Sequence, residues 1–277
     1  MTTLMERARA LVDRVGELPA VPAVVLKAME MLNDPSVTVK RIQEQILLDP
    51  ALTACVLKVA NSALYGLRKE VNTVSYAINL MGYNTTKSIL MSHLTKSMYQ
   101  ASGSAFIHNT LWKHAVASGV FARYLADELK TVNREEAFIA ALLHDIGKGV
   151  LARNLSQPFS QIVEKVVNEG ADELHLERQV LGVSHVEAGY LLMQQWRFSD
   201  ATIEALVYHH NQPDYEGRNP LVPIVSLANK MAHLHGYAFV QTAHELVEAR
   251  GLGLDAEHLS RAAEKGEVEI NHLLEIL

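Results

Sequence analysis

Apolar residues recur at steps of three and four along almost the whole chain. The pattern is clearest at 24–32 (VVLKAMEML), 39–48 (VKRIQEQILL) and 111–129 (LWKHAVASGVFARYLADEL). This spacing places the apolar side chains on one face of a helix, which is then available for burial against other helices. Runs that alternate as strands do are scarce, and the turn signals do not come in hairpin pairs. The sequence therefore predicts an all-α protein.

Several helix ends are also marked in the sequence. Pro22 and Pro50 stand at first-turn positions, and Asp49, Ser156 and Ser199 are candidate N-caps. Helix ends are expected at three glycines that follow periodic stretches, where a left-handed residue can terminate a helix: Gly147, Gly170 and Gly236.

The pattern divides the chain, without sharp boundaries, into an extension, a main domain of two subdomains, and a tail. We expect an N-terminal helical extension at 1–13 and a main domain at 14–236, followed by an acidic, amphipathic helical tail at 237–277. The main domain itself divides into helical subdomains at 14–104 and 105–236. The tail is expected to pack on the body or on a second copy of the chain, so a homodimer is one arrangement open to it.

Composition narrows the function classes. The 277 residues are enough for a sizeable buried core, and the formal charge of -6 argues against a duplex nucleic-acid binder, which needs a basic face. The single cysteine, Cys55, cannot form an internal disulfide, which fits a reducing compartment. The N-terminus is interrupted by charges and later apolar runs are short, so neither a signal peptide nor a membrane span is expected. These features predict a cytoplasmic protein.

Histidines gather in the second subdomain. The apolar segment 137–149 (AFIAALLHDIGKG) runs into His144 and Asp145, and 201–213 (ATIEALVYHHNQP) ends in a histidine pair. His114 and His185 lie beside apolar residues in two other helical segments. The candidate metal ligands are therefore His114, His144, Asp145, His185, His209 and His210. The alternative interpretation of the doublet is that His144 and Asp145 hydrogen-bond each other and close a helix.

This mixture of imidazole and carboxylate suits a divalent transition metal such as Fe, Mn, Zn, Ni or Co, bound as one or two ions. Asp145 is placed to bridge two ions, with the histidines divided between them. The other histidines are expected to be ordinary core or surface residues: His93, His108, His175, His233, His235, His244, His258 and His272. Glu177, eight residues before His185, is either an additional ligand or a surface charge, and the surface charge is the favoured interpretation.

The spacing of these residues resembles the HD superfamily of metal-dependent phosphohydrolases, whose pattern is H…HD…D. The segment 142–148 (LLHDIGK) is similar to its signature. By this resemblance Asp145 and Lys148 take catalytic roles, with Lys148 near a substrate phosphate. Asn229, in 225–232 (VSLANKMA), occupies the place of the final aspartate ligand. The amide would weaken the first metal position, whereas the second, from Asp145 and the histidines at 185, 209 and 210, is complete.

The chain more specifically resembles the HDOD family of bacterial signalling proteins. The resembling segments are 18–32, 46–66, 74–83 and 180–196 (LPAVPAVVLKAMEML, ILLDPALTACVLKVANSALYG, VSYAINLMGY, VLGVSHVEAGYLLMQQW). The resemblance implies an all-helical fold with an HD-like core and a regulatory role, with a signalling protein or a small phosphorylated ligand as partner. It leaves two hypotheses open: a regulatory and interaction module with a metal-binding pocket, or a metal-dependent phosphohydrolase acting on a nucleotide or another phosphoester.

Overall fold

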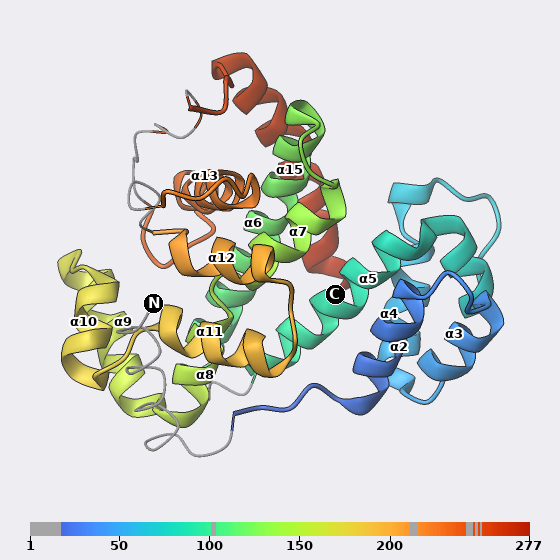
Figure 1. Ribbon diagram of the computed structural model, residues 1–277, viewed down its shortest axis with the longest axis horizontal. Coiled ribbons are helices and arrows are strands. Elements are labelled where there is room, and N and C mark those ends of the chain that lie inside the picture. Colours follow the sequence, from blue (N-terminus) through green and yellow to red (C-terminus); the bar gives the residue numbers. More distant parts are fainter. Residues whose placement is uncertain (1–17, 101–103, 211–214, 242–245, 247–248, 250) are drawn as a thin grey trace. The chain divides into compact units, whose positions relative to one another are not determined.

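The computed structural model describes residues 18–100, 104–210, 215–241, 246, 249 and 251–277. The elements found in these ranges are helices, without a strand, so the predicted all-α class is confirmed (Figure 1). The expected extension at 1–13 and His244 lie outside the described residues. Within the described ranges, no helix combines the length and the apolar character that a bilayer span requires.

The chain forms two compact units, each with its own core. The small unit comprises Ala20–Leu94 and Val268–Leu277, and the large unit comprises Thr95–Glu267 with the described residues before Ala20. Two helices, α5 (Val74–Gln100) and α15 (Ala256–Ile276), contribute residues to both units. The two units are described separately below.

The small unit is built from short helices at the start of the chain. It contains α2 (Ala23–Asn33), α3 (Val39–Ile46), α4 (Pro50–Ala60) and the 3₁₀ turn η1 (Ala63–Tyr65), with the first part of α5. The Asp49 side chain accepts hydrogen bonds from the amides of Ala51 and Leu52 at 2.9 and 3.0 Å, which confirms it as the N-cap of α4. Its core includes Ile42, Ile46 and Val56.

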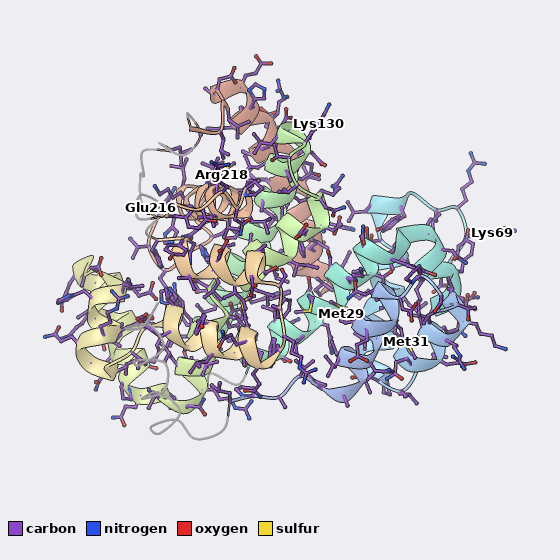
Figure 2. All side chains as sticks on the ribbon, viewed as in Figure 1. Met29, Met31, Lys69, Lys130, Glu216 and Arg218 are labelled. Carbon is purple, nitrogen blue, oxygen red and sulfur yellow. The ribbon has the colours of Figure 1, made fainter. Side chains whose placement is uncertain are left out.

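The large unit holds the remaining helices. They are α6 (Ala105–Leu129), α7 (Arg134–Leu143), α8 (Ile146–Asn154), α9 (Ser156–Glu169), α10 (Glu173–Leu181), α11 (His185–Gln195), α12 (Asp200–Tyr208) and α13 (Leu221–Leu234). Helix α6 is buried along most of its length and packs against α7 and α13, while α12 covers α13 and α8 lies on α11. Charged side chains such as Lys130, Glu216 and Arg218 are exposed (Figure 2).

Most of the marked helix ends agree with the structure. Ser199 caps α12 through a bond from the Thr202 amide, and Gly170 ends α9 with φ of +65°. Ser156 is the first residue of α9 and not its N-cap, because the preceding Leu155 occupies that position. Gly236 also has a positive φ, of +80°, just after α13. Gly170 and Gly236 were predicted correctly as helix ends, because glycine adopts a positive φ without a steric clash.

Gly147 does not end a helix, so that prediction is wrong. Helix α7 stops at Leu143, and Gly147 lies in the first turn of the next helix, α8. A Cβ atom at Gly147 would overlap the carbonyl oxygen of His185 and lie 2.6 Å from the amide nitrogen of Gly189. The glycine is therefore needed for the close approach of α8 to α11, and not for a left-handed cap.

Candidate metal centre

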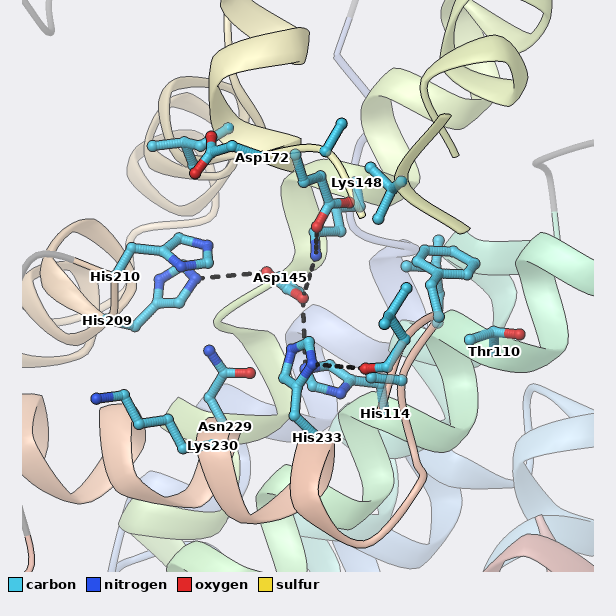
Figure 3. A pocket seen from close by; sticks show the side chains of 18 of the residues that line it. Thr110, His114, Asp145, Lys148, Asp172, His209, His210, Asn229, Lys230 and His233 are labelled. Carbon is cyan, nitrogen blue, oxygen red and sulfur yellow. Dashed lines mark hydrogen bonds and ion pairs between the residues drawn. The ribbon is translucent and has the colours of Figure 1, made fainter. Parts of the chain in front are cut away.

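The predicted site residues converge in the large unit, although they come from five places in the chain. His114 lies on α6, and His144 and Asp145 form the junction between α7 and α8. His185 begins α11, His209 and His210 follow α12, and Asn229 lies on α13. Figure 3 shows most of these side chains facing one cavity. Their role as metal ligands stays a prediction, which the geometry below supports.

The doublet of His144 and Asp145 lies at the break between helices α7 and α8. His144 is the C-cap of α7, as expected for the end of that apolar helix. Asp145 does not belong to this last turn, because it is the N-cap residue of α8. The contact of Gly147 with α11 brings His185, the first residue of α11, to the same junction. The doublet and His185 thus meet because two helices begin side by side.

The Asp145 carboxylate divides its two oxygens between two groups of histidines. Its Oδ2 lies 3.5 Å from His114 Nε2 and 3.4 Å from His144 Nε2. Its Oδ1 lies 3.4 Å from His185 Nε2 and 3.5 Å from His209 Nε2. His210 completes the second group, in which the potential ligand atoms all lie within 4.8 Å of one another. A carboxylate that bridged two metal ions would be arranged in this way.

Backbone carbonyls orient three of the imidazoles. The Nδ1 atoms of His114, His144 and His209 lie 3.0, 2.6 and 2.6 Å from the carbonyl oxygens of Tyr237, Ala141 and Leu206. A carbonyl oxygen only accepts hydrogen bonds, so each Nδ1 carries the proton and each Nε2 presents a lone pair. His144 therefore donates to Ala141 and not to Asp145, which argues against the interpretation of the doublet as a simple helix closure.

The Nε2 atoms of four candidate ligands lie close together in two pairs. His114 Nε2 and His144 Nε2 are 3.3 Å apart, and His185 Nε2 and His210 Nε2 are 3.0 Å apart. Burial lowers the pKa of His144 and of His185 to about 3, although Asp145 opposes this effect in both. These two imidazoles are therefore neutral near pH 7, which is the form that binds metals.

Some buried polar atoms in the centre have no hydrogen-bond partner among the residues that the structure describes. Asp145 Oδ1, His209 Nε2 and Asn229 Oδ1 are all in this condition. Leaving such atoms unsatisfied costs about 1–3 kcal/mol each. A cation held by these donors would remove that cost, so the residues present fit a transition-metal site.

Lys148 is nearly fully buried and already paired. Its Nζ lies 2.8 Å from Asp145 Oδ2 and 2.9 Å from Glu173 Oε2. Burial by itself lowers the pKa of Lys148, but the two carboxylates outweigh it and raise that pKa. Burial likewise opposes ionisation of Asp145, yet His144 and Lys148 hold its pKa well below the usual value. The centre thus keeps an ionised carboxylate, and the expected phosphate contact of Lys148 stays a prediction.

The centre opens into a cavity of about 330 Å³. One end carries the candidate ligands with Lys148, and the rest is lined mainly by apolar residues of α6, the α9–α10 turn and the segment after α13, including Leu111, Val166, Ala171, Leu174, Phe239 and Val240. Asn229 faces this cavity, as expected for the position of the closing ligand (Figure 3).

Two residues at the centre differ from the expectations. Glu177 is fully buried and contacts His185, so its interpretation as a surface charge is wrong. His233 lines the cavity, with its ring 5.1 Å from that of His114. The position of His233 four residues after Asn229, on the same face of α13, was the available signal. For Glu177 the sequence held no comparable signal, because a single glutamate on an amphipathic helix is usually exposed.

The protein is an all-α protein with a buried cluster of histidines around one aspartate. The HDOD domain profile matches residues 18–212, and the chain belongs to the HDOD family. This match confirms the resemblance to the HDOD family that was drawn from the sequence. The fold of a solved HDOD structure agrees with it.

Particular relatives show how far the likeness extends. An HDOD domain protein of unknown function from Geobacter sulfurreducens is 25% identical, with a TM-score of 0.86 and coverage of 100% of this chain and 99% of that chain. A proposed phosphohydrolase from Shewanella amazonensis is 24% identical, with a TM-score of 0.73 over 96% of each chain, which shows the fold alone. An uncharacterized protein of Treponema pallidum is 27% identical over 82% of this chain, but this chain spans only 44% of its length.

Proposed function

We propose that this chain is a regulatory and interaction module of bacterial signal transduction whose centre binds one or two divalent transition-metal ions. One observation carries the metal site: Asp145 directs each carboxylate oxygen at a separate pair of imidazoles. Three of the histidines have their lone pairs aimed inward by backbone carbonyls. Membership of the HDOD family supports the signalling role. We place the module in the cytoplasm, with a signalling protein or a small phosphorylated ligand as partner.

Asn229 favours regulation over catalysis. At the first position, the donors are His114, His144, Asp145 and an amide oxygen, so one negative charge serves that ion and must be shared with the second. An amide oxygen is a weaker ligand than a carboxylate because it carries no net charge. A centre of this kind holds an ion for structure or for sensing more readily than it holds a pair poised for hydrolysis.

A phosphohydrolase is the second candidate, favoured by Lys148 and by the cavity. When bound, divalent ions supply Lewis-acid activation of a phosphoester and of water. In that role Asp145 would hold both ion positions, and the Lys148 ammonium beside it would neutralise phosphate charge. Lys148 would have to exchange its contact with Glu173 for the phosphate.

Metal analysis tests the proposed site. We expect protein purified without chelators or nickel affinity resin to retain about one or more transition-metal ions per chain, and His144→Ala to lose most of them. His175→Ala, which removes an exposed histidine of α10, is the matched control and should keep the wild-type content. Substoichiometric content of every metal, before and after reconstitution, would refute the site.

The choice between the two candidates needs a separate assay. The reconstituted protein is incubated with a generic aryl phosphate, and release of the phenol is followed against a His144→Ala sample. The regulatory proposal expects no release above that sample. Turnover that depends on His144 and on added metal would favour the phosphohydrolase.

A further inference from the structure

Glu177 is a buried carboxylate in contact with a candidate ligand. Its side chain on α10 is fully buried, and its Oε2 lies 2.7 Å from His185 Nδ1 and 2.8 Å from the His185 backbone nitrogen. The same oxygen therefore accepts the backbone N–H of His185 and contacts its imidazole. This double contact fixes both the start of α11 and the ring of its first residue.

The burial of this carboxylate is costly without a compensating role. Its other oxygen, Oε1, has no hydrogen-bond partner within the described part of the chain. Burial raises the pKa of Glu177 to about 8, and the Lys148 ammonium and the hydrogen bond from the His185 amide offset this only in part. A transition-metal ion held by His185 would add positive charge through the imidazole and so favour the ionised carboxylate.

The contact also makes the two metal positions unequal. At His114, His144 and His209, Nδ1 faces a neutral backbone carbonyl. At His185 it faces the carboxyl group of Glu177, which holds the orientation of the ring and, in its ionised form, would raise the basicity of the imidazole. The second position therefore combines Asp145, three histidines and a buried carboxyl group in contact with one of them, whereas the first contains the Asn229 amide.

We propose that Glu177 is a positioning residue that makes the second position, formed by Asp145, His185, His209 and His210, the tighter of the two, so that it fills first. This inference rests on the proposed metal binding. It assigns the order of filling to a residue that does not itself touch the ion.

The test compares Glu177→Gln with Glu187→Gln by titrating the metal-free chain with Co²⁺ in competition with a chromophoric chelator. Glutamine at 177 retains an oxygen that accepts both bonds from His185 but removes the charge. We expect the affinity of the tighter class to fall about 10- to 100-fold. The visible absorption bands of the first Co²⁺ bound should change as well.

Glu187 offers a matched control. It is a buried glutamate two residues from His185, where it forms a capping box with Ser184. A glutamine retains such a cap, so Glu187→Gln removes a buried charge without altering the contact with His185. Its Co²⁺ affinity should equal that of the wild type. An unchanged tight affinity in Glu177→Gln, or an equal loss in both variants, overturns the inference.

Asn229→Asp provides an arm that does not depend on the folding of the Glu177 variant. The inference expects this substitution to strengthen the weaker class only, since residue 229 serves the first position. Strengthening of the tight class would overturn it. Absence of any Co²⁺ binding by the wild-type chain would overturn the proposed function together with this inference, whereas binding that is insensitive to Glu177→Gln overturns this inference alone.

Discussion

Asn229 is positioned as a ligand although its chemistry is that of an amide. The side chain is 6% exposed and faces the cavity, and its Oδ1 has no hydrogen-bond partner in the ranges that the structure describes. An amide that merely filled space there would carry the cost of an unsatisfied buried oxygen. This position fits the proposed closing ligand of the first metal position, without the charge that a carboxylate would carry.

Asn229→Asp should make the chain more dependent on metal. In the presence of chelator, a second carboxylate beside Asp145 repels it, so the melting temperature should fall below that of the wild type. With saturating Zn²⁺ the added charge attracts the ion, so the rise in melting temperature should exceed the wild-type rise. Thermal unfolding with and without metal measures both effects. Asn72→Asp, at an exposed position of the small unit, is the control and should show neither.

At the scale of elements, the packing of α8 on α11 assembles the centre. Helix α8 begins directly after the doublet, and α11 begins at His185. Gly147 and Gly189 lie where these helices meet, and Gly147 has no room for a side chain. Small residues at a helix crossing allow the two backbones to approach closely. In this protein the close approach brings together the candidate ligands at the starts of α8 and α11.

Gly147→Ala should therefore damage both stability and the centre. The added methyl group would overlap the His185 carbonyl, so α11 must shift, and we expect a loss of about 3 kcal/mol in the free energy of unfolding. Because His185 moves with α11, Co²⁺ affinity should fall as well. Urea unfolding and Co²⁺ titration measure the two effects.

The control for this prediction is Gly251→Ala. Among the described residues, no atom lies within 4 Å of a Cβ added to that glycine, and its φ is not positive. Its free energy of unfolding should stay within about 0.5 kcal/mol of the wild type. Equal stability of the Gly147 and Gly251 variants would contradict the role given to the α8–α11 contact.

At the scale of the whole molecule, the candidate ligands all belong to the large unit. The positions from His114 to Asn229 lie within Thr95–Glu267. Binding stabilises the folded state of the structure that contains the ligands, by mass action. The two units should therefore respond differently to metal.

Hydrogen exchange can show this difference. Saturating Zn²⁺ should slow exchange in α7, α8, α11 and the C-terminal end of α12, since opening these segments would release the ion. Exchange in α2, α3 and α4 of the small unit should change much less. A uniform slowing across both units would contradict the prediction and would mean that the two unfold as one cooperative body.

The sequence by itself predicted the helical fold and most members of the centre. Helical periodicity and capping are local, so segments such as 111–129 and caps such as Asp49 can be recognised from neighbouring residues. The doublet at 144–145 and the histidine pair at 209–210 could be singled out because each follows an apolar helix. Asn229 was found only through the resemblance to a family, because an isolated asparagine carries no periodic signal.

Only the tertiary structure decided how these residues meet. Gly147 was predicted as a helix end because a glycine after an apolar run has that local meaning, yet its role comes from contact with His185 and Gly189. Glu177 was predicted at the surface, yet it lies behind His185, because burial on a short helix depends on what packs against it. The division of the Asp145 oxygens between two histidine groups likewise arises from packing among distant helices, which periodicity within one helix does not encode.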